Sequence, residues 1–233
     1  MKKQWIVAAL LIGVSLPVVG QKKEEERVEE AGKVMKEILN LPDGIPQSVL
    51  DKADCVVVLP SVKKFALGVG GSYGRGVMTC RGGQDFKGKW GTPTMMALEG
   101  GSFGLQIGGE ATDFVLLLMT SSSASSILSS KVKLGGDASA AAGPVGRTAS
   151  AETDVALKAE ILTYSRARGA FAGVSLEGST LRPDNDANKR LYGKEIPAKE
   201  IVKEGTVPAP SSADTLIATL DKSSPENKSS RKN

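Results

Sequence analysis

The sequence predicts an α+β fold, in which a glycine-rich, mostly antiparallel sheet carries helices on its flanks. Residues near both ends recur at helical spacing, whereas the middle of the chain is built from β-branched runs separated by glycines. The chain holds 27 glycines among 233 residues, and glycine within strands marks bends, bulges or close backbone approach. Such a sheet is barrel-like in character, and the sequence leaves open whether it closes.

The N-terminal residues 1–20 have the features of a signal peptide. Lys2 and Lys3 precede an apolar run from Trp5 to Val19, and small residues end the segment at Gly20. The run is shorter than the roughly 20 apolar residues that span a bilayer, so we expect cleavage after Gly20. A retained N-terminal anchor is the alternative. No cysteine follows the run to accept a lipid, so we expect an exported protein, periplasmic or extracellular, that associates peripherally with a membrane.

Helices are predicted next in the chain. Residues 21–31 form a charged lead-in, expected to be solvated, and a helix is predicted over residues 28–39 from its apolar face. Pro42-Asp43-Gly44 ends this helix. A second, short helix is predicted from Pro46 to about Ala53, with proline in its first turn.

The β region begins at Cys55. The run 55–59, closed by Pro60, is typical of a fully buried strand. Glycine pairs at 82–83 and 100–101 are interpreted as turns between strands. The further strands predicted in this region are 65–70, 72–81, 86–98, 102–109 and 113–119.

The second half alternates between the two types of element. Helices are predicted over 121–131, 184–191 and 212–220, and strands over 138–142, 156–165 and 170–176. Residues 221–233 are polar, have no apolar face and are expected to be disordered. One domain is therefore expected over residues 32–220.

Composition argues against most enzyme classes. The chain contains no histidine, which removes the commonest general base and the commonest metal ligand. Cys55 and Cys80 form one disulfide or are two buried thiols, and both interpretations stay open. A dinucleotide fingerprint starting at Gly68 would need glycine where Tyr73 stands. We therefore expect no catalytic residues, no metal and no cofactor. Removal of Lys2 and Lys3 with the signal peptide would lower the net charge from +4 to +2, which is too small to indicate nucleic acid.

Basic residues are the better indication of function. Pairing of 72–81 with 86–91 through Gly82-Gly83 would create a cationic hairpin with an aromatic tip, suited to an anionic membrane surface. A solvated sheet edge, protected from aggregation by its lysines, is the alternative. The candidate lipid-binding residues are Lys63, Lys64, Arg75, Lys87, Lys89 and Trp90.

Several segments in order resemble the SYLF domain family. They are Gly44–Ala53 leading into Cys55–Pro60, Gly70–Val77, Trp90–Pro93, Gly100–Gly108, Asp113–Leu118, Lys133–Asp137, Ala142–Arg147 and Tyr164–Gly178, followed by Asn188, Tyr192 and Gly193. The most distinctive is Tyr-Ser-Arg-Ala-Arg-Gly-Ala-Phe-Ala-Gly-Val-Ser-Leu-Glu-Gly at 164–178. Together these segments extend over about residues 32–220.

The resemblance implies a β-rich domain with flanking helices and non-enzymatic lipid binding. Eukaryotic members bind phosphoinositides and in some cases actin, often beside an SH3 or FYVE module that this sequence does not show. Three arginines lie in the matched motifs: Arg147, Arg166 and Arg168. They are expected either to contact lipid headgroups or to be structural arginines that pair with Asp137 or Glu177. The leading hypothesis is an exported protein that binds anionic phospholipid headgroups. The alternative is an envelope scaffold that binds a protein partner through a sheet edge.

Overall fold

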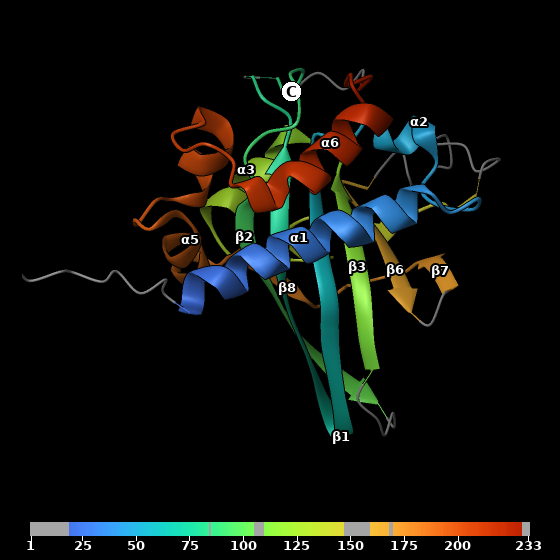
Figure 1. The fold of residues 1–233 in the computed structure, drawn as a ribbon. Helices are drawn as coiled ribbons and strands as arrows, with labels where there is room; N and C mark the ends of the chain where they lie inside the picture. Colours follow the sequence, from blue (N-terminus) through green and yellow to red (C-terminus); the bar gives the residue numbers. More distant parts are fainter. Residues whose placement is uncertain (1–18, 84, 105–109, 147–158, 168–169, 230–233) are drawn as a thin grey trace, which may run out of the picture.

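The fold is one curled sheet with helices packed on both of its faces (Figure 1). The computed structural model describes residues 19–229, apart from 84, 105–109, 147–158 and 168–169. The strand order is β4-β8-β2-β1-β3-β6-β5, with β7 also paired to β6. Each strand pair is antiparallel except β5 with β6. The predicted α+β class with a mostly antiparallel sheet is confirmed.

The elements have the following bounds. The strands are β1 (Cys55–Cys80), β2 (Thr94–Gly104), β3 (Glu110–Leu118), β4 (Val132–Lys133), β5 (Ala140–Ala142), β6 (Ile161–Ala167), β7 (Ala170–Gly173) and β8 (Thr180–Pro183). The helices are α1 (Val19–Leu39), α2 (Gln47–Leu50), α3 (Ser121–Ser129), α5 (Asn185–Tyr192) and α6 (Asp214–Ser223), with a π-helical turn η1 (Glu200–Glu204) and a 3₁₀ turn η2 (Ser211–Ala213).

Strand β1 doubles back on itself. Its 26 residues would extend roughly 85 Å if straight, yet the Cα atoms of Cys55 and Cys80 are 4.0 Å apart. The first arm, residues 55–64, pairs with β3, and the second arm, residues 68–78, pairs with β2. Figure 1 shows the two arms side by side down the middle of the sheet. β1 therefore supplies two central strands of the sheet.

Glycine allows the two arms to approach this closely. A Cβ atom at Gly76 would lie 1.9 Å from the carbonyl oxygen of Val58. A Cβ atom at Gly74 would lie 2.4 Å from Cγ2 of Val62. The first contact involves backbone, which cannot move aside as the end of a side chain can. Gly76 is therefore required by the packing of the arms, in agreement with the expected role of glycine in this sheet.

The core lies on both faces of the sheet because side chains alternate along the buried strands. Val56 and Val58 point toward the face covered by α1 and α6, whereas Cys55, Val57 and Leu59 point toward the face that includes α3. All of these side chains are fully buried. The expectation of a fully buried strand at 55–59 is confirmed.

Several predicted boundaries differ from the structure. Gly100 and Gly101 do not form a turn but lie inside β2, opposite Ser72 and Gly71 of β1. Residues 86–93 are not part of a strand, and the only ladder contact there among the described residues is an isolated bridge between Arg81 and Trp90. Strand β8 was not expected. Glycine pairs are compatible with extended backbone as well as turns, so their presence did not locate the reversals.

The charged lead-in at 21–31 is helical and belongs to α1. Glu24 within it is buried beside Arg190 of α5, so tertiary contacts order a segment whose composition indicates a solvated one. The expected signal peptide lies almost wholly outside the described residues, which begin at Val19.

The C-terminal tail also differs from the expected disorder. After α6, residues Ser224–Ser229, here called the C-terminal strap, pack along the end of the sheet near α2. Ser224 is fully buried, and Lys228 donates its backbone N–H to the Asp51 carbonyl oxygen at 2.7 Å. The strap is held by polar contacts, which an apolar pattern in the sequence does not reveal.

Substitution of Gly76 by alanine should strongly destabilise the fold. The added methyl group overlaps the Val58 carbonyl, so the arms must separate, at a cost of about 3 kcal/mol or more. Urea unfolding followed by circular dichroism measures the change. Gly71→Ala in the same strand is the matched control, since its Cβ would lie 3.6 Å from the nearest atom, in ordinary contact. Equal unfolding midpoints for the two variants would contradict the close packing of the arms.

Candidate functional site

A cleft between α1 and the two arms of β1 is the best candidate for a binding site. It has a volume of about 710 Å³. Four basic side chains line it, together with two acidic ones. The lining residues are Lys23, Glu26, Arg27 and Glu30 from α1, and Pro60, Ser61, Lys63, Tyr73, Gly74 and Arg75 from β1. This surface is called the α1–β1 cleft below.

Helical spacing divides α1 between the cleft and the core. Lys23, Arg27 and Glu30 are three or four positions apart and therefore share one face of the helix. The core face carries fully buried side chains that include Val28 and Met35. Burial of this apolar face fixes the rotation of α1, which in turn directs its charged face toward β1.

A β-bulge shapes the wall of the cleft opposite α1. The register between β1 and β3 shifts between Leu59 and Val62, where Pro60 has no N–H to donate to the ladder. Ser61 has a positive φ of 51° and donates its backbone N–H to Oδ1 of Asp113 at 2.9 Å. The bulge interrupts the first arm beside the cleft, and the side chain of Lys63 just beyond it is exposed.

Two arginines give the cleft its electrostatic character. Burial lowers the pKa of Arg27, and the positive charge of nearby Arg75 lowers it further. Nε of Arg75 donates to the hydroxyl oxygen of Tyr73 at 2.5 Å and also lies 3.0 Å from Oδ2 of Asp184. The contact with Asp184 is an ion pair without an aligned hydrogen bond, because the single Nε–H already points toward Tyr73. An anion placed between the two guanidinium groups would relieve their mutual repulsion.

A buried carboxylate supports the cleft from behind. Glu24 is 1 % exposed and pairs with Arg27. Its Oε1 also accepts hydrogen bonds from Nε and Nη2 of Arg190 at 3.0 and 2.8 Å. Charge-assisted contacts of this kind hold Arg27 in place and tie α1 to α5.

The structure brings together only part of the predicted lipid-binding set. Lys63 and Arg75 line the α1–β1 cleft, and Lys64 belongs to β1, although its side chain is outside the described residues. Lys87 and Lys89 are exposed, but they lie outside the cleft, and Lys87 donates to the Ser229 carbonyl oxygen at 2.8 Å.

Trp90 cannot form the expected aromatic tip. Its side chain is 4 % exposed, the Arg81 guanidinium lies 4.3 Å above its ring, and its indole N–H donates to the Ser224 carbonyl oxygen. The expectation of an exposed tryptophan was therefore wrong, because the ring packs in the core, although Arg81 and Trp90 do pair across the turn at Gly82-Gly83. Tyr73, which is 43 % exposed on the cleft wall, is the aromatic residue that the sequence analysis missed.

The three arginines from the resemblance have different positions. Arg147 and Arg168 lie outside the described residues. Arg166 donates from Nη2 to Oδ2 of Asp113 at 2.7 Å and also pairs with Glu37 of α1. It is a structural arginine, as one alternative held, although its partners are not the acids expected.

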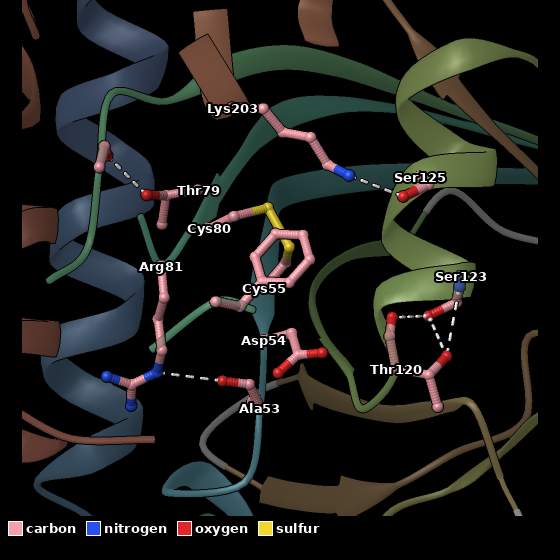
Figure 2. Close-up of a disulfide and its surroundings, with 12 residues drawn as sticks. Ala53, Asp54, Cys55, Thr79, Cys80, Arg81, Thr120, Ser123, Ser125 and Lys203 are labelled. Atoms are coloured by element: carbon pink, nitrogen blue, oxygen red, sulfur yellow. Dashed lines mark hydrogen bonds between the residues drawn. A yellow bond between two sulfur atoms is a disulfide. The ribbon is translucent and has the colours of Figure 1, made fainter. Parts of the chain in front are cut away.

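Cys55 and Cys80 are joined by a disulfide, which decides between the two interpretations left open by the sequence. Both residues are fully buried. Figure 2 shows the bond with the Arg81 side chain directed toward the carbonyl oxygen of Ala53, to which its Nε donates at 3.2 Å. Lys203 reaches Ser125 of α3 on the other side of the bond. The disulfide therefore joins the open ends of the two arms.

A second, smaller cleft of about 450 Å³ is a weaker candidate. Lys131, Arg182 and Lys199 are among its lining residues. Arg182 is already neutralised, because its Nη2 donates to Glu99 at 2.6 Å and this bond lowers the pKa of the Glu99 carboxyl. The two remaining basic groups are exposed lysines, so we assign the main candidate site to the α1–β1 cleft.

The chemistry of the α1–β1 cleft is that of a binding site. Its lining offers guanidinium, ammonium and phenol groups, which recognise anions. Both cysteines are in the disulfide, and no cluster of three potential metal ligands occurs among the described residues. Within residues 19–229 as described, no helix combines the length and apolar character needed to cross a bilayer.

Comparison with known proteins identifies relatives over most of the chain. The family model described as "Ysc84: Las17-binding protein actin regulator" matches residues 99–223. The SH3 domain-containing protein PJ696.02 of Schizosaccharomyces pombe is 35% identical over 219 residues, which are 90% of this chain and 49% of that protein. LAS seventeen-binding protein 3 of Saccharomyces cerevisiae is 31% identical, over 90% of this chain and 46% of its own length. The human SH3 domain-containing YSC84-like protein 1 is 32% identical, over 88% of this chain and 60% of its own length. This chain thus spans about half the length of the first two relatives.

Substitution of Glu24 by glutamine should lower the free energy of unfolding by about 2–4 kcal/mol. The change leaves Arg27 and Arg190 without their shared counter-charge in a partly buried setting. Thermal and urea unfolding measure the loss. Glu30→Gln on the same helix is the control, because its ion pair with Lys33 is exposed and contributes less than about 0.5 kcal/mol. If both variants lost the same stability, the buried carboxylate would not be the support of the cleft.

Proposed function

Since the chain belongs to the Ysc84 family, we propose that it is a non-enzymatic binding domain whose α1–β1 cleft binds anionic phospholipid headgroups. The family match also confirms the resemblance to the SYLF domain, which is the same family. The proposal for the ligand rests on the cleft and not on the names of the relatives.

The pair of arginines in the cleft is the observation that carries the proposal. Arg27 and Arg75 line the same cleft, and the positive charge of Arg75 lowers the pKa of Arg27, so an anion bound there can contact both guanidinium groups. Guanidinium groups match the geometry of phosphate oxygens. Lys23 and Lys63 add two exposed ammonium groups at the same cleft.

Tyr73 supports a location at a membrane surface. Its ring is the large aromatic side chain most exposed among the described residues, and it lies beside Arg75. Aromatic rings with a polar end favour the interfacial zone of a bilayer, and each basic residue near an anionic surface contributes about 1 kcal/mol. We propose an exported protein, periplasmic or extracellular, that is held peripherally by these contacts.

A protein partner is the second candidate for this surface. The family description and the names of the relatives refer to Las17-binding and SH3-containing proteins. Glu26 and Glu30 also line the cleft, and a surface of mixed charge suits a protein with a complementary pattern. On this alternative the chain is an envelope scaffold, and lipid contact is incidental.

Charge reversal at the cleft tests the lipid proposal. The double variant Lys23→Glu/Lys63→Glu should bind vesicles of phosphatidylglycerol and phosphatidylcholine at least 30-fold more weakly than the wild type, since two contacts of about 1 kcal/mol each become repulsive. Co-sedimentation at low and high salt measures the affinity. Both lysines are exposed, and no ion pair to either is present among the described residues, so folding should be unaffected.

Lys87→Glu/Lys89→Glu is the matched control, with the same change of charge outside the cleft. Loss of binding in this variant alone would move the lipid site to the loop after Gly83. Absence of vesicle binding by the wild type at both salt concentrations would favour the protein partner. Equal pull-down of one stoichiometric envelope protein by the wild type and by the cleft variant would place that partner elsewhere.

A further inference from the structure

The C-terminal strap lies in a groove whose side chains contact its hydroxyl, carbonyl, amide and ammonium groups. It is formed by Gln47 and Asp51 around α2, by Asp54 and Arg81 beside the disulfide, and by Trp90. It lies at the disulfide end of the β1 arms, and none of these residues lines the α1–β1 cleft. We call it the strap groove.

Ser224 is the most completely recognised residue of the strap. Its hydroxyl donates to Oδ1 of Asp51 at 2.8 Å and accepts from Nη2 of Arg81 at 2.6 Å. Its carbonyl oxygen accepts from the indole N–H of Trp90 at 3.0 Å. A hydroxyl that donates and accepts at once distinguishes serine or threonine from other small residues.

Asn227 and Lys228 occupy two further positions. The amide nitrogen of Asn227 donates to Oδ1 of Asp54 at 2.7 Å and to the Phe86 carbonyl oxygen at 2.9 Å. The ammonium group of Lys228 lies 2.8 Å from Oδ2 of Asp51. The intervening residues 225 and 226 are exposed. The groove thus binds a serine, an amide side chain three residues later and the lysine that follows it.

Several contacts that position the strap groove do not involve the strap. Arg81 donates its backbone N–H to the Asp54 carbonyl oxygen at 3.0 Å and its Nε–H to the Ala53 carbonyl oxygen. The disulfide adjoins both Asp54 and Arg81, and the ring of Trp90 supports the guanidinium group. A groove that is fixed by these contacts remains in place when its occupant leaves.

The strap itself is held in a way that permits exchange. Its contacts among the described residues include several hydrogen bonds and the ion pair of Lys228 with Asp51, and the Lys228 side chain is 65 % exposed. The entropic cost of ordering six residues offsets part of the free energy that these polar contacts contribute. Nη1 of Arg81 is buried and has no hydrogen-bond partner in the part of the chain that the structure describes. The strap therefore leaves one donor of its groove unused, which a different peptide can satisfy.

We propose that the strap groove is a peptide-binding site that the chain's own residues 224–229 occupy in cis. When the strap leaves, the groove accepts a partner segment with the pattern Ser-x-x-Asn-Lys in extended form. The proposal is independent of the lipid function of the α1–β1 cleft.

A labelled peptide of residues 221–229 tests the proposal on the full chain. In wild type the tethered strap competes at high effective concentration, so the added peptide should bind weakly. In Asn227→Ala/Lys228→Ala the competitor is weakened, and the peptide should bind at least ten-fold more tightly. Adding Asp51→Asn to this double variant should remove that gain. Lys222→Ala, exposed and just before the strap, is the matched control and should behave as wild type.

Fluorescence anisotropy gives the affinities, and circular dichroism shows that each variant is folded. No gain in the folded double variant would overturn the proposal and make the strap a fixed end of the domain. A gain that survives Asp51→Asn would also overturn it, since binding would then be non-specific ionic attraction. Hydrogen exchange of wild type needs no variant: the Lys228 amide should exchange at least 100-fold faster than the β3 amides, and equal protection would contradict an exchangeable strap.

Discussion

The contact between the two arms of β1 determines the arrangement of the rest of the molecule. Gly76 faces the Val58 backbone with no room for a side chain, and the disulfide joins the open ends of the arms. Because each arm has a free edge on its other side, β2 and β3 add to opposite sides of the pair. β8 then extends the sheet beyond β2, and β6 extends it beyond β3. Both candidate binding surfaces border this central pair, one along the arms and the other at their ends.

The described arginines differ in whether they line the α1–β1 cleft. Arg166 is held by Asp113 and Glu37, and Arg190 is held by Glu24, the carboxylate that also pairs with Arg27. Arg81 lies flat on Trp90 in the interior. Arg27 and Arg75 also have carboxylate partners, Glu24 and Asp184, but in addition both line an open cleft. A guanidinium group that is held in place by a carboxylate and also lines a cleft is suited to contact an anion there.

The sequence was sufficient to predict the structure where a local pattern determines it. It was insufficient where contacts between distant residues determine the structure. The run 55–59, the helix at 121–129 and the glycine-dependent sheet follow from periodicity and composition. The charged residues 21–31 suggest a solvated segment, yet the burial of Glu24 by Arg190, 166 residues away, makes them part of a packed helix.

Lys63 and Arg75 were identified as basic residues of the sheet, but Lys23 and Arg27 were not, because only the fold places that helical face opposite them. The spacing of Lys23, Arg27 and Glu30 was a usable signal that the expectation of a solvated lead-in obscured. Trp90 was misplaced because its alternation with lysines imitates an exposed strand.

The disulfide has a further consequence for the tip of the β1 hairpin. The bond closes a covalent ring that contains both arms, so the polypeptide between residues 64 and 68 is a second connection between strands already joined at Cys55 and Cys80. In an oxidising compartment, where such bonds persist, a protease cut at the tip would leave one molecule with all its strands still linked. Chain continuity at the tip is thus redundant for holding the arms together. This position can accept a nick, an insertion or new termini at little cost to the sheet.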